Sequence, residues 1–388
     1  MPEAHGYLHA LLKNIEVLRE KAVMTQAQLE ERLILGPGWI SRFEKGETVP
    51  SIDMVLAILH ETNTNISDLL EGLPEPDAAM IERCIFAEEV GNDVTVYFRY
   101  AKSDARYTLP SSTLEHFEKV IKTLRDGLAR RAGFSQKEEG GERGKAVKTD
   151  AVARTFLAAV HVWPHVNPSD LWWFIVYRAY CDPYNHPANF ARLNFEQSWK
   201  RTGGWALEVI LTKHYGPFLK KHGIMLLIPD TPMREKIVQR LNLEDRVEAD
   251  KIDVVLWGNN STGAPVFFGV VHVKASFAER RTDDVPLSRA LTRAGYTSPL
   301  WTMDCKSMPG PHPINRGELG ATAGRISAKR KDIEAEGYFT GCFSYNQNTV
   351  PSAPTLPEHR RVYVCDFNNP DDAFSRFIIS RWQTFPKS

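Results

Sequence analysis

The sequence lacks the features that would place the chain in a membrane or in an oxidising compartment. No run of about 18 apolar residues occurs, so we expect no membrane span. The N-terminal stretch carries charges among its apolar positions, and we expect no signal peptide there. The five cysteines are scattered, odd in number and without a CxxC pair, which argues against a disulfide framework or a structural zinc site. A cytoplasmic protein is therefore the expectation.

The chain also lacks net charge. Its 48 basic and 48 acidic residues cancel, so any surface that binds nucleic acid has to be local. Hydrophobic residues at 43% and charged residues at 25% are ordinary for a globular protein. The length of 388 residues suffices for two or three domains.

Four segments differ in composition and periodicity. Apolar residues at helical spacing predict a bundle of short helices over residues 1–75. An alternating pattern followed by a helical one predicts a small hairpin-plus-helix unit, a spacer or a dimerisation element, over residues 76–132. Residues 133–149 contain Gly, Glu and Lys without apolar periodicity and predict a flexible linker. Interleaved helix and strand patterns predict one α/β domain over residues 150–388.

The first segment contains a helix-turn-helix pattern. Thr25-Gln26 is suited to begin one helix, Ile40-Ser41-Arg42 lies in a second, and Pro50-Ser51 follows. The pattern resembles the phage-repressor-like helix-turn-helix family, whose second helix enters the major groove. The resemblance implies a DNA-binding unit, and the alternative is a helical bundle used for dimerisation or docking. The candidate DNA contacts are Gln26, Trp39, Ser41, Arg42 and Lys45.

The pattern departs from that family at three places. Glu30 stands where the family has a small residue, and Ile34 stands at the usual turn glycine. The second helix starts with Gly36-Pro37-Gly38, which offers no side-chain donors to bases or phosphates.

Two apolar runs in the last segment, 252–257 and 266–273, are joined by a turn of Gly, Asn, Ser and Pro and predict a β-hairpin. Asp253 begins the first run and Lys274 ends the second, so antiparallel pairing brings them together. Phosphodiester hydrolysis needs a divalent cation held by oxygen ligands and a positive charge near the phosphate. A carboxylate and a lysine supply these two parts. Asp250 is the alternative to Asp253.

This hairpin resembles the PD-(D/E)xK nuclease superfamily, in which Asp starts one strand and (Asp/Glu)-x-Lys ends the next. His272 takes the place of the second acid. The segment Lys-Ala-Ser-Phe-Ala-Glu-Arg-Arg at 274–281 is similar to type II restriction endonucleases whose second acid lies on the following helix, including relatives of the group that cuts CCGG-containing sites. The resemblance implies a catalytic set of Asp253, Lys274, Glu279 and an auxiliary Glu208, with Asp253 and Glu279 as metal ligands and Arg280 and Arg281 facing DNA.

The position of the second acid stays open. In the CCGG group the displaced acid lies further from the lysine, where this chain has Ser288 and Arg289. Asp283 and Asp284 therefore compete with Glu279. Asp304-Cys305-Lys306 also has D-x-K spacing and ranks second as a catalytic core, because no strand bearing an acid lies immediately before it.

These patterns predict an α/β restriction-endonuclease-like core, a mixed sheet flanked by helices, plus an N-terminal all-α helix-turn-helix domain. The implied function is that of a Mg²⁺-dependent type II restriction endonuclease acting on double-stranded DNA. Cutting both strands of a symmetric site implies a homodimer. The alternatives are a DNA-binding transcription regulator with a C-terminal sensor domain, and a repair or mobile-element nuclease. The recognition sequence and the cut position do not follow from the sequence.

Overall fold

The computed structural model describes residues 2–45, 47–48, 50–73, 84–100, 103–190, 193–240, 249–276, 281–320 and 326–386, with the backbone alone at 2–9 and 281–283. The chain forms two compact units, Met1–Arg83 and Cys84–Ser388. No helix in these described ranges is long and apolar enough to cross a membrane.

The first unit is all-α, as predicted. Its helices are α1 (Pro2–Lys21), α2 (Gln26–Arg32), α3 (Trp39–Glu44), α4 (Ile52–Glu61) and α5 (Ile66–Leu69). Thr25 caps α2 as expected, because its hydroxyl accepts from the Gln28 backbone N–H while the Gln28 side chain accepts from the Thr25 N–H. The core contains Ile15, Leu29, Ile40 and Ile58 among other buried apolar residues.

The predicted linker at residues 133–149 is wrong. The segment forms α7 (Gln136–Gly140) and the start of α8 (Glu142–Val162). Glu139 is buried and forms ion pairs with Arg131 (2.7 Å) and Lys148 (3.0 Å). Charged side chains thus stabilise these helices through tertiary ion pairs, which apolar periodicity does not reveal.

The second unit begins with a three-stranded antiparallel sheet, β1 (Ile85–Val90), β2 (Asp93–Tyr100) and β3 (Ser103–Leu109). Next come α6 (Leu114–Ala129), α7, α8, α9 (Pro168–Asp170), the π-helical turn η2 (Leu171–Val176), α10 (Tyr177–Cys181), η3 (Pro183–Asn185) and η4 (Ala188–Phe190). Phe98 and Phe117 share one buried core with Phe156 and Trp172. Residues 84–132 are therefore an integral part of this unit, and the predicted separate spacer is wrong.

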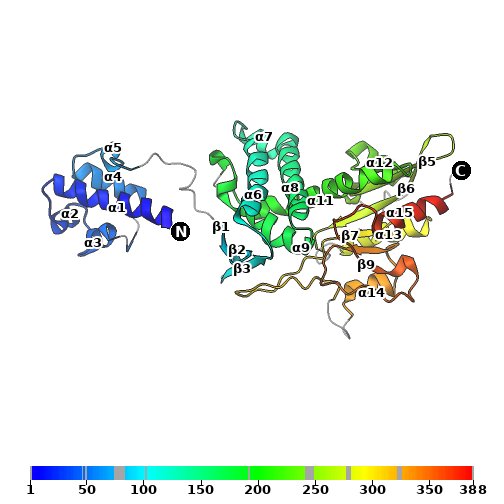
Figure 1. Cartoon of the computed structure of the whole chain (residues 1–388). Helices are drawn as coiled ribbons and strands as arrows, with labels where there is room; N and C mark the ends of the chain where they lie inside the picture. The colour runs from blue at the N-terminus through cyan, green and yellow to red at the C-terminus, as the bar shows by residue number, and fades with distance from the viewer. Residues whose placement is uncertain are drawn as a thin grey trace. The chain divides into compact units, whose positions relative to one another are not determined.

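A six-stranded mixed sheet forms the other part of the second unit (Figure 1). Its order is β4 (Ile224–Leu227), β5 (Val254–Asn259), β6 (Pro265–Lys274), β7 (Leu300–Thr302), β8 (Cys342–Ser344) and β9 (Val362–Val364). β4, β5 and β6 pair antiparallel, whereas β6 to β9 pair parallel. The carboxyl ends of β6 to β9 therefore lie at one edge of the sheet.

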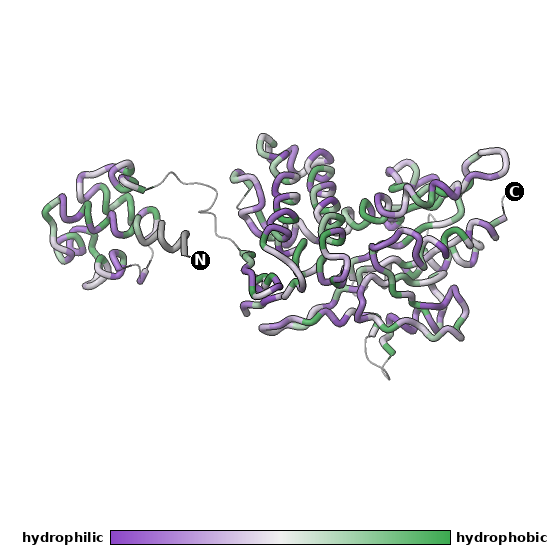
Figure 2. Tube along the Cα trace, in the orientation of Figure 1, coloured by the Kyte–Doolittle hydropathy of each residue, from purple (hydrophilic) through white to green (hydrophobic). Residues whose placement is uncertain are grey.

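Helices cover both faces of this sheet, and Figure 2 shows hydrophobic residues along its strands. Val254, Phe268 and Trp301 share a core with α11 (Phe195–Lys220) and α15 (Ala373–Thr384). On the opposite face, Val255 and Val270 share a second core with α12 (Thr231–Arg240) and α13 (Arg281–Arg293). α14 (Ala328–Glu334) covers β7 to β9, and the short turns η5 (Ala249–Lys251) and η6 (Glu358–Arg360) complete the unit. The predicted mixed sheet flanked by helices is confirmed.

α11 continues through a glycine pair. It begins at Phe195 with Asn194 as its cap and runs past Gly203-Gly204. A Cβ at Gly203 would lie 3.2 Å from the Trp199 ring, so glycine serves close packing inside the helix here.

Candidate active site

The predicted hairpin is formed by β5 and β6. Asn260 closes its turn, because its side-chain oxygen accepts from the Thr262 (3.1 Å) and Ala264 (2.9 Å) backbone N–H groups. Pairing of Val254 with Val271 sets the register. Asp253 directly precedes β5 and Lys274 ends β6, so this register brings the two side chains together.

Lys274 and Asp253 form a buried ion pair. The Lys274 Nζ lies 2.8 Å from Asp253 Oδ2, and the exposed fractions of the two residues are 7% and 8%. The same Asp253 oxygen accepts from the Val273 backbone N–H at 2.8 Å. Two hydrogen bonds therefore fix this carboxylate at the carboxyl end of β6.

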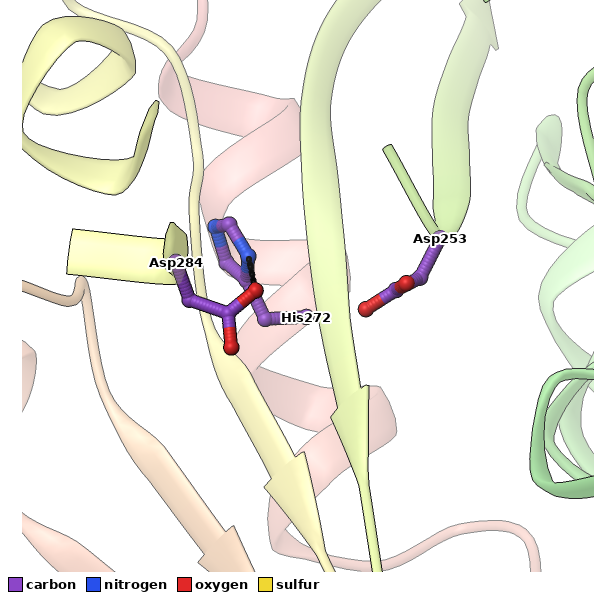
Figure 3. Close-up of side chains that lie close together, drawn as sticks. All are labelled: Asp253, His272 and Asp284. Carbon is purple, nitrogen blue, oxygen red and sulfur yellow. Dashed lines mark ion pairs between the residues drawn. The ribbon is translucent and has the colours of Figure 1, made fainter. Parts of the chain in front are cut away.

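Asp284 is the second carboxylate at Lys274. It lies in the first turn of α13 and is 1% exposed. α13 packs on the sheet through buried Leu287 and Leu291, which places Asp284 Oδ1 3.2 Å from Lys274 Nζ. Figure 3 shows Asp253 on one side of β6 and Asp284 with His272 on the other. One ammonium group thus connects carboxylates from a strand end and from a helix.

His272 lies behind Asp284 and is fully buried. Its Nδ1 is 3.8 Å from Asp284 Oδ1 (Figure 3), and its Nε2 is 2.9 Å from the Ser298 hydroxyl. Ser288, one of the residues at the larger spacing considered above, is also buried and bonds Ser298 Oγ (2.8 Å) and the Tyr338 carbonyl (2.7 Å). His272, Ser288 and Ser298 thus form a buried polar layer next to Asp284 that supports α13.

The charges at this site shift several pKa values. Burial alone would lower the pKa of Lys274, but the nearby Asp253 and Asp284 raise it overall. Burial alone would raise the pKa of Asp284, but the nearby His272 ring and the charge of Lys274 lower it overall. The ammonium and the Asp284 carboxylate therefore stay ionised near neutral pH.

Glu208 faces the same site from α11. It is 8% exposed, and burial, followed by the charge of Asp253, raises its pKa to about 8. The charges of Asp253 and Lys274 both act on the pKa of Glu208, so its carboxyl group lies near this ion pair. Glu208 holds its proton at neutral pH and adds no negative charge next to Asp253 in that state.

The site has the donor set of a divalent-metal centre. Asp253, His272 and Asp284 each offer a ligand atom, and these atoms lie within 4.8 Å of one another. Asp284 Oδ2 is buried and has no hydrogen-bond partner among the described residues, and the same holds for His272 Nδ1. A buried carboxylate oxygen without a partner is costly unless a ligand satisfies it. The residues present therefore fit a divalent cation.

The acids that the sequence left as alternatives lie in different surroundings. Asp250 is exposed and pairs with Lys251 at 3.6 Å, so Asp253 is the acid at Lys274. Glu279 and Arg280 lie outside the described residues. Arg281 begins α13, and its side chain and that of Asp283 also lie outside the described residues.

The second D-x-K motif is structural. Asp304 is fully buried, and its Oδ1 accepts from the backbone N–H groups of Glu318 (2.6 Å) and Leu319 (3.1 Å). Its Oδ2 accepts from the Thr349 hydroxyl at 2.7 Å. Lys306 is exposed. Asp304 therefore organises a loop and forms no acid–lysine pair.

The candidate contacts of the helix-turn-helix unit lie on or beside α3. Trp39 is 38% exposed, with the Arg42 guanidinium 4.5 Å from its ring centre, and Lys45 is exposed. Ser41 is half-buried. The Gln26 side chain donates to Glu44 at 2.5 Å and is thereby held inside the unit.

Acidic groups dominate this unit. Glu30, which stands where the helix-turn-helix family has a small residue, has a structural role. Its buried carboxylate accepts a hydrogen bond from the Ile40 backbone N–H (2.9 Å) at the start of α3. Met1–Arg83 contains seven Lys and Arg and fourteen Asp and Glu, a net charge of −7. The remaining 41 basic and 34 acidic residues give Cys84–Ser388 a net charge of +7. The zero net charge of the chain thus conceals an acidic and a basic unit.

Comparisons with known proteins agree with both units. Residues 14–65 match the model of a family described as a helix-turn-helix domain. The chain is 40% identical over 250 residues to the type II restriction enzyme AgeI of Thalassovita gelatinovora, covering 61% of this chain and 85% of that enzyme. The crystal structure of a specific restriction endonuclease AgeI–DNA complex matches with a TM-score of 0.62 and 33% identity, over 74% of this chain and 99% of that chain. This similarity confirms the predicted restriction endonuclease over the regulator and repair alternatives, and the chain belongs to the type II restriction enzymes.

Proposed function

We propose that the chain hydrolyses phosphodiester bonds of double-stranded DNA with Mg²⁺ at the group formed by Asp253, Lys274 and Asp284. The observation that carries the proposal is the Lys274 ammonium, buried between two carboxylates at 2.8 and 3.2 Å. Mg²⁺ prefers one or two carboxylates together with water and phosphate oxygens. The crystallised AgeI complex contains DNA, which supports DNA as the substrate.

Each residue has a distinct role in this proposal. Asp253 and Asp284 would hold Mg²⁺, which when bound polarises the phosphate and lowers the pKa of water. Lys274 stabilises the negative charge that develops on the phosphate, and the raised pKa of its ammonium keeps it positive. Glu208 is an auxiliary acid whose proton limits the repulsion with Asp253. His272 orients Asp284 from behind.

We assign the second metal ligand to Asp284 in place of Glu279. Among the described residues, Asp284 is the carboxylate that shares Lys274 with Asp253. Arg280 and Arg281 precede Asp284 on the chain and remain our candidates for reading guanine, since arginine binds its O6 and N7 edge with two hydrogen bonds.

We further propose that the active enzyme is a homodimer. Each subunit has one set of Asp253, Lys274 and Asp284, so a double-strand cut at a symmetric site requires two subunits. Light scattering coupled to size exclusion should give twice the 44.0 kDa mass of one chain. A monomeric mass in the presence of cleaved DNA would contradict this part of the proposal.

Cleavage of plasmid DNA tests the reaction. Wild-type protein with Mg²⁺ should give discrete fragments, and EDTA should abolish them. Lys274→Ala should lose cleavage, whereas Lys220→Ala, an exposed lysine at the opposite end of the sheet, should retain it. Absence of cutting with every divalent metal tried, or full activity of Lys274→Ala, would overturn the proposal.

A further inference from the structure

A two-armed ribbon, residues 305–317, leaves the sheet at the end of β7, beside the candidate active site. The Met303 N–H donates to the Lys274 carbonyl at 3.0 Å, and the Cys305 N–H donates to the Ala275 carbonyl at 2.9 Å. The base of the ribbon is thus hydrogen-bonded to the strand end that carries Lys274. Figure 1 shows the ribbon running from β7 alongside β3.

The two arms pair antiparallel. Ser307 pairs with Asn315 as an isolated bridge. The Arg316 N–H donates to the Lys306 carbonyl at 3.1 Å, and the Met308 N–H donates to the Ile314 carbonyl at 3.0 Å. This register places Lys306 directly opposite Arg316 and Met308 directly opposite Ile314, all on one face of the ribbon.

Buried amide side chains hold the base of the ribbon. Asn315, 2% exposed, donates to the Ser169 hydroxyl (2.6 Å) and accepts from the Lys306 N–H (2.9 Å). Asn346, fully buried, donates to the Asp304 carbonyl at 3.0 Å. The sequence predicted Asp304 as a rival catalytic acid, and the structure uses it to anchor the ribbon.

The tip of the ribbon is held as well. The Arg106 N–H of β3 donates to the Pro311 carbonyl at 3.2 Å, and the Arg106 guanidinium contacts the His312 ring at 3.1 Å. Prolines at 309, 311 and 313 limit the backbone further. An element fixed at both ends presents its free face with little loss of entropy on binding.

The free face combines two cations with two apolar side chains. Lys306 and Arg316 are exposed, as are Met308 (46%) and Ile314 (50%), whereas Pro313 and Asn315 on the other face are buried. Like charges directly opposite one another destabilise a strand pair. Neither cation has a side-chain partner among the residues that the structure describes. The pair therefore concentrates positive charge beside the active site.

We propose that this face of the ribbon binds the backbone of the duplex that is cut at Asp253, Lys274 and Asp284. Lys306 and Arg316 contact phosphate, and Met308 and Ile314 pack against the adjacent sugars. The inference rests on the proposed function. It is supported by the hydrogen bonds between the ribbon and the Lys274 strand end, by the charge complementarity, and by the fit of a two-stranded ribbon to a DNA groove.

The salt dependence of binding tests the contact. The affinity of the double variant Lys306→Ala/Arg316→Ala of the full chain and that of the wild type would be measured with a fluorescent duplex of mixed sequence in Ca²⁺, between about 50 and 200 mM salt. Removing two phosphate contacts should reduce the slope of log affinity against log salt by about 2, and affinity should fall on every duplex sequence alike. The control Lys220→Ala/Lys221→Ala makes the same charge change at the exposed end of α11 and should keep the wild-type slope.

Two further variants keep the test decisive. Arg316→Gln alone should reduce the slope by about 1, and Lys306→Arg should retain it, since each phosphate contact contributes about one unit. A folded double variant, judged by an unchanged melting temperature, with the wild-type slope would overturn the ribbon proposal. If the double variant does not fold, a wild-type slope for Arg316→Gln overturns it. Failure of the wild type itself to bind any duplex would instead overturn the proposed function.

Discussion

Replacing Asp284 by Asn removes one of the two carboxylates that contact Lys274 while keeping the size of the side chain. At 3.2 Å, the two charges attract by roughly 5 kcal/mol if the effective dielectric constant is about 20. Burial of both groups and the second carboxylate, Asp253, offset most of this attraction, so the free energy of unfolding should change by less than about 2 kcal/mol. The cleavage rate should change more than the stability. A metal held by one carboxylate in place of two should lose about 4 kcal/mol of transition-state stabilisation, which corresponds to a rate about a thousandfold lower.

Single-turnover cleavage of a plasmid in Mg²⁺ measures this loss. Asp250→Asn is the matched control, because Asp250 is exposed and lies three residues before Asp253. It should cleave like the wild type, and Asp284→Asn should still bind DNA in Ca²⁺ with a melting temperature near that of the wild type. Glu279→Gln should retain activity within about tenfold of the wild type, a loss of no more than about 1.4 kcal/mol. Wild-type cleavage by Asp284→Asn together with an inactive Glu279→Gln would refute the assignment.

Three further predictions concern stability and the acidic unit. Burial, followed by the charge of Arg131, lowers the pKa of His186 to about 3. The free energy of unfolding should therefore fall by about 2 kcal/mol between pH 6.5 and 5, because the unfolded chain takes up the proton. Urea unfolding of His186→Gln should show a smaller change of this free energy with pH, and the same change as in the wild type would contradict the prediction. Gly258→Ala should destabilise by about 1–3 kcal/mol, since the new Cβ would lie 2.3 Å from the Trp382 ring; an unchanged melting temperature would disprove this packing. Arg42→Ala/Lys45→Ala should weaken DNA binding less than about threefold, or 0.6 kcal/mol, because the unit has a net charge of −7; a loss of tenfold or more would show that α3 binds DNA despite that charge.

Local patterns in the sequence predicted the elements that carry the chemistry. The two apolar runs and the turn around Asn260 define the β5–β6 hairpin, and antiparallel pairing then fixes which residues meet at its end. Asp253 and Lys274 could be paired for that reason. The cap at Thr25 and the register of the helix-turn-helix were likewise local features.

Tertiary contacts decided what the sequence could not. Asp284 reaches Lys274 because Leu287 and Leu291 dock α13 on the sheet, a contact that spacing along the chain does not encode. Asp304 has the same D-x-K spacing as a catalytic motif, yet it is buried and accepts hydrogen bonds from backbone groups that are distant in sequence. The charged residues at 133–149 resembled a linker because their partners, such as Arg131, lie outside that segment.

The position of the bound metal shows directly whether Asp253 and Asp284 are its ligands. Crystals of the wild type with duplex DNA and Mn²⁺, measured at a wavelength where manganese scatters anomalously, would show the ion without reference to the protein density. We expect an anomalous peak within about 2.0–2.4 Å of oxygens from both Asp253 and Asp284, as for a hard divalent cation. A peak coordinated by Glu279 and remote from Asp284, or no peak at Asp253, would contradict it.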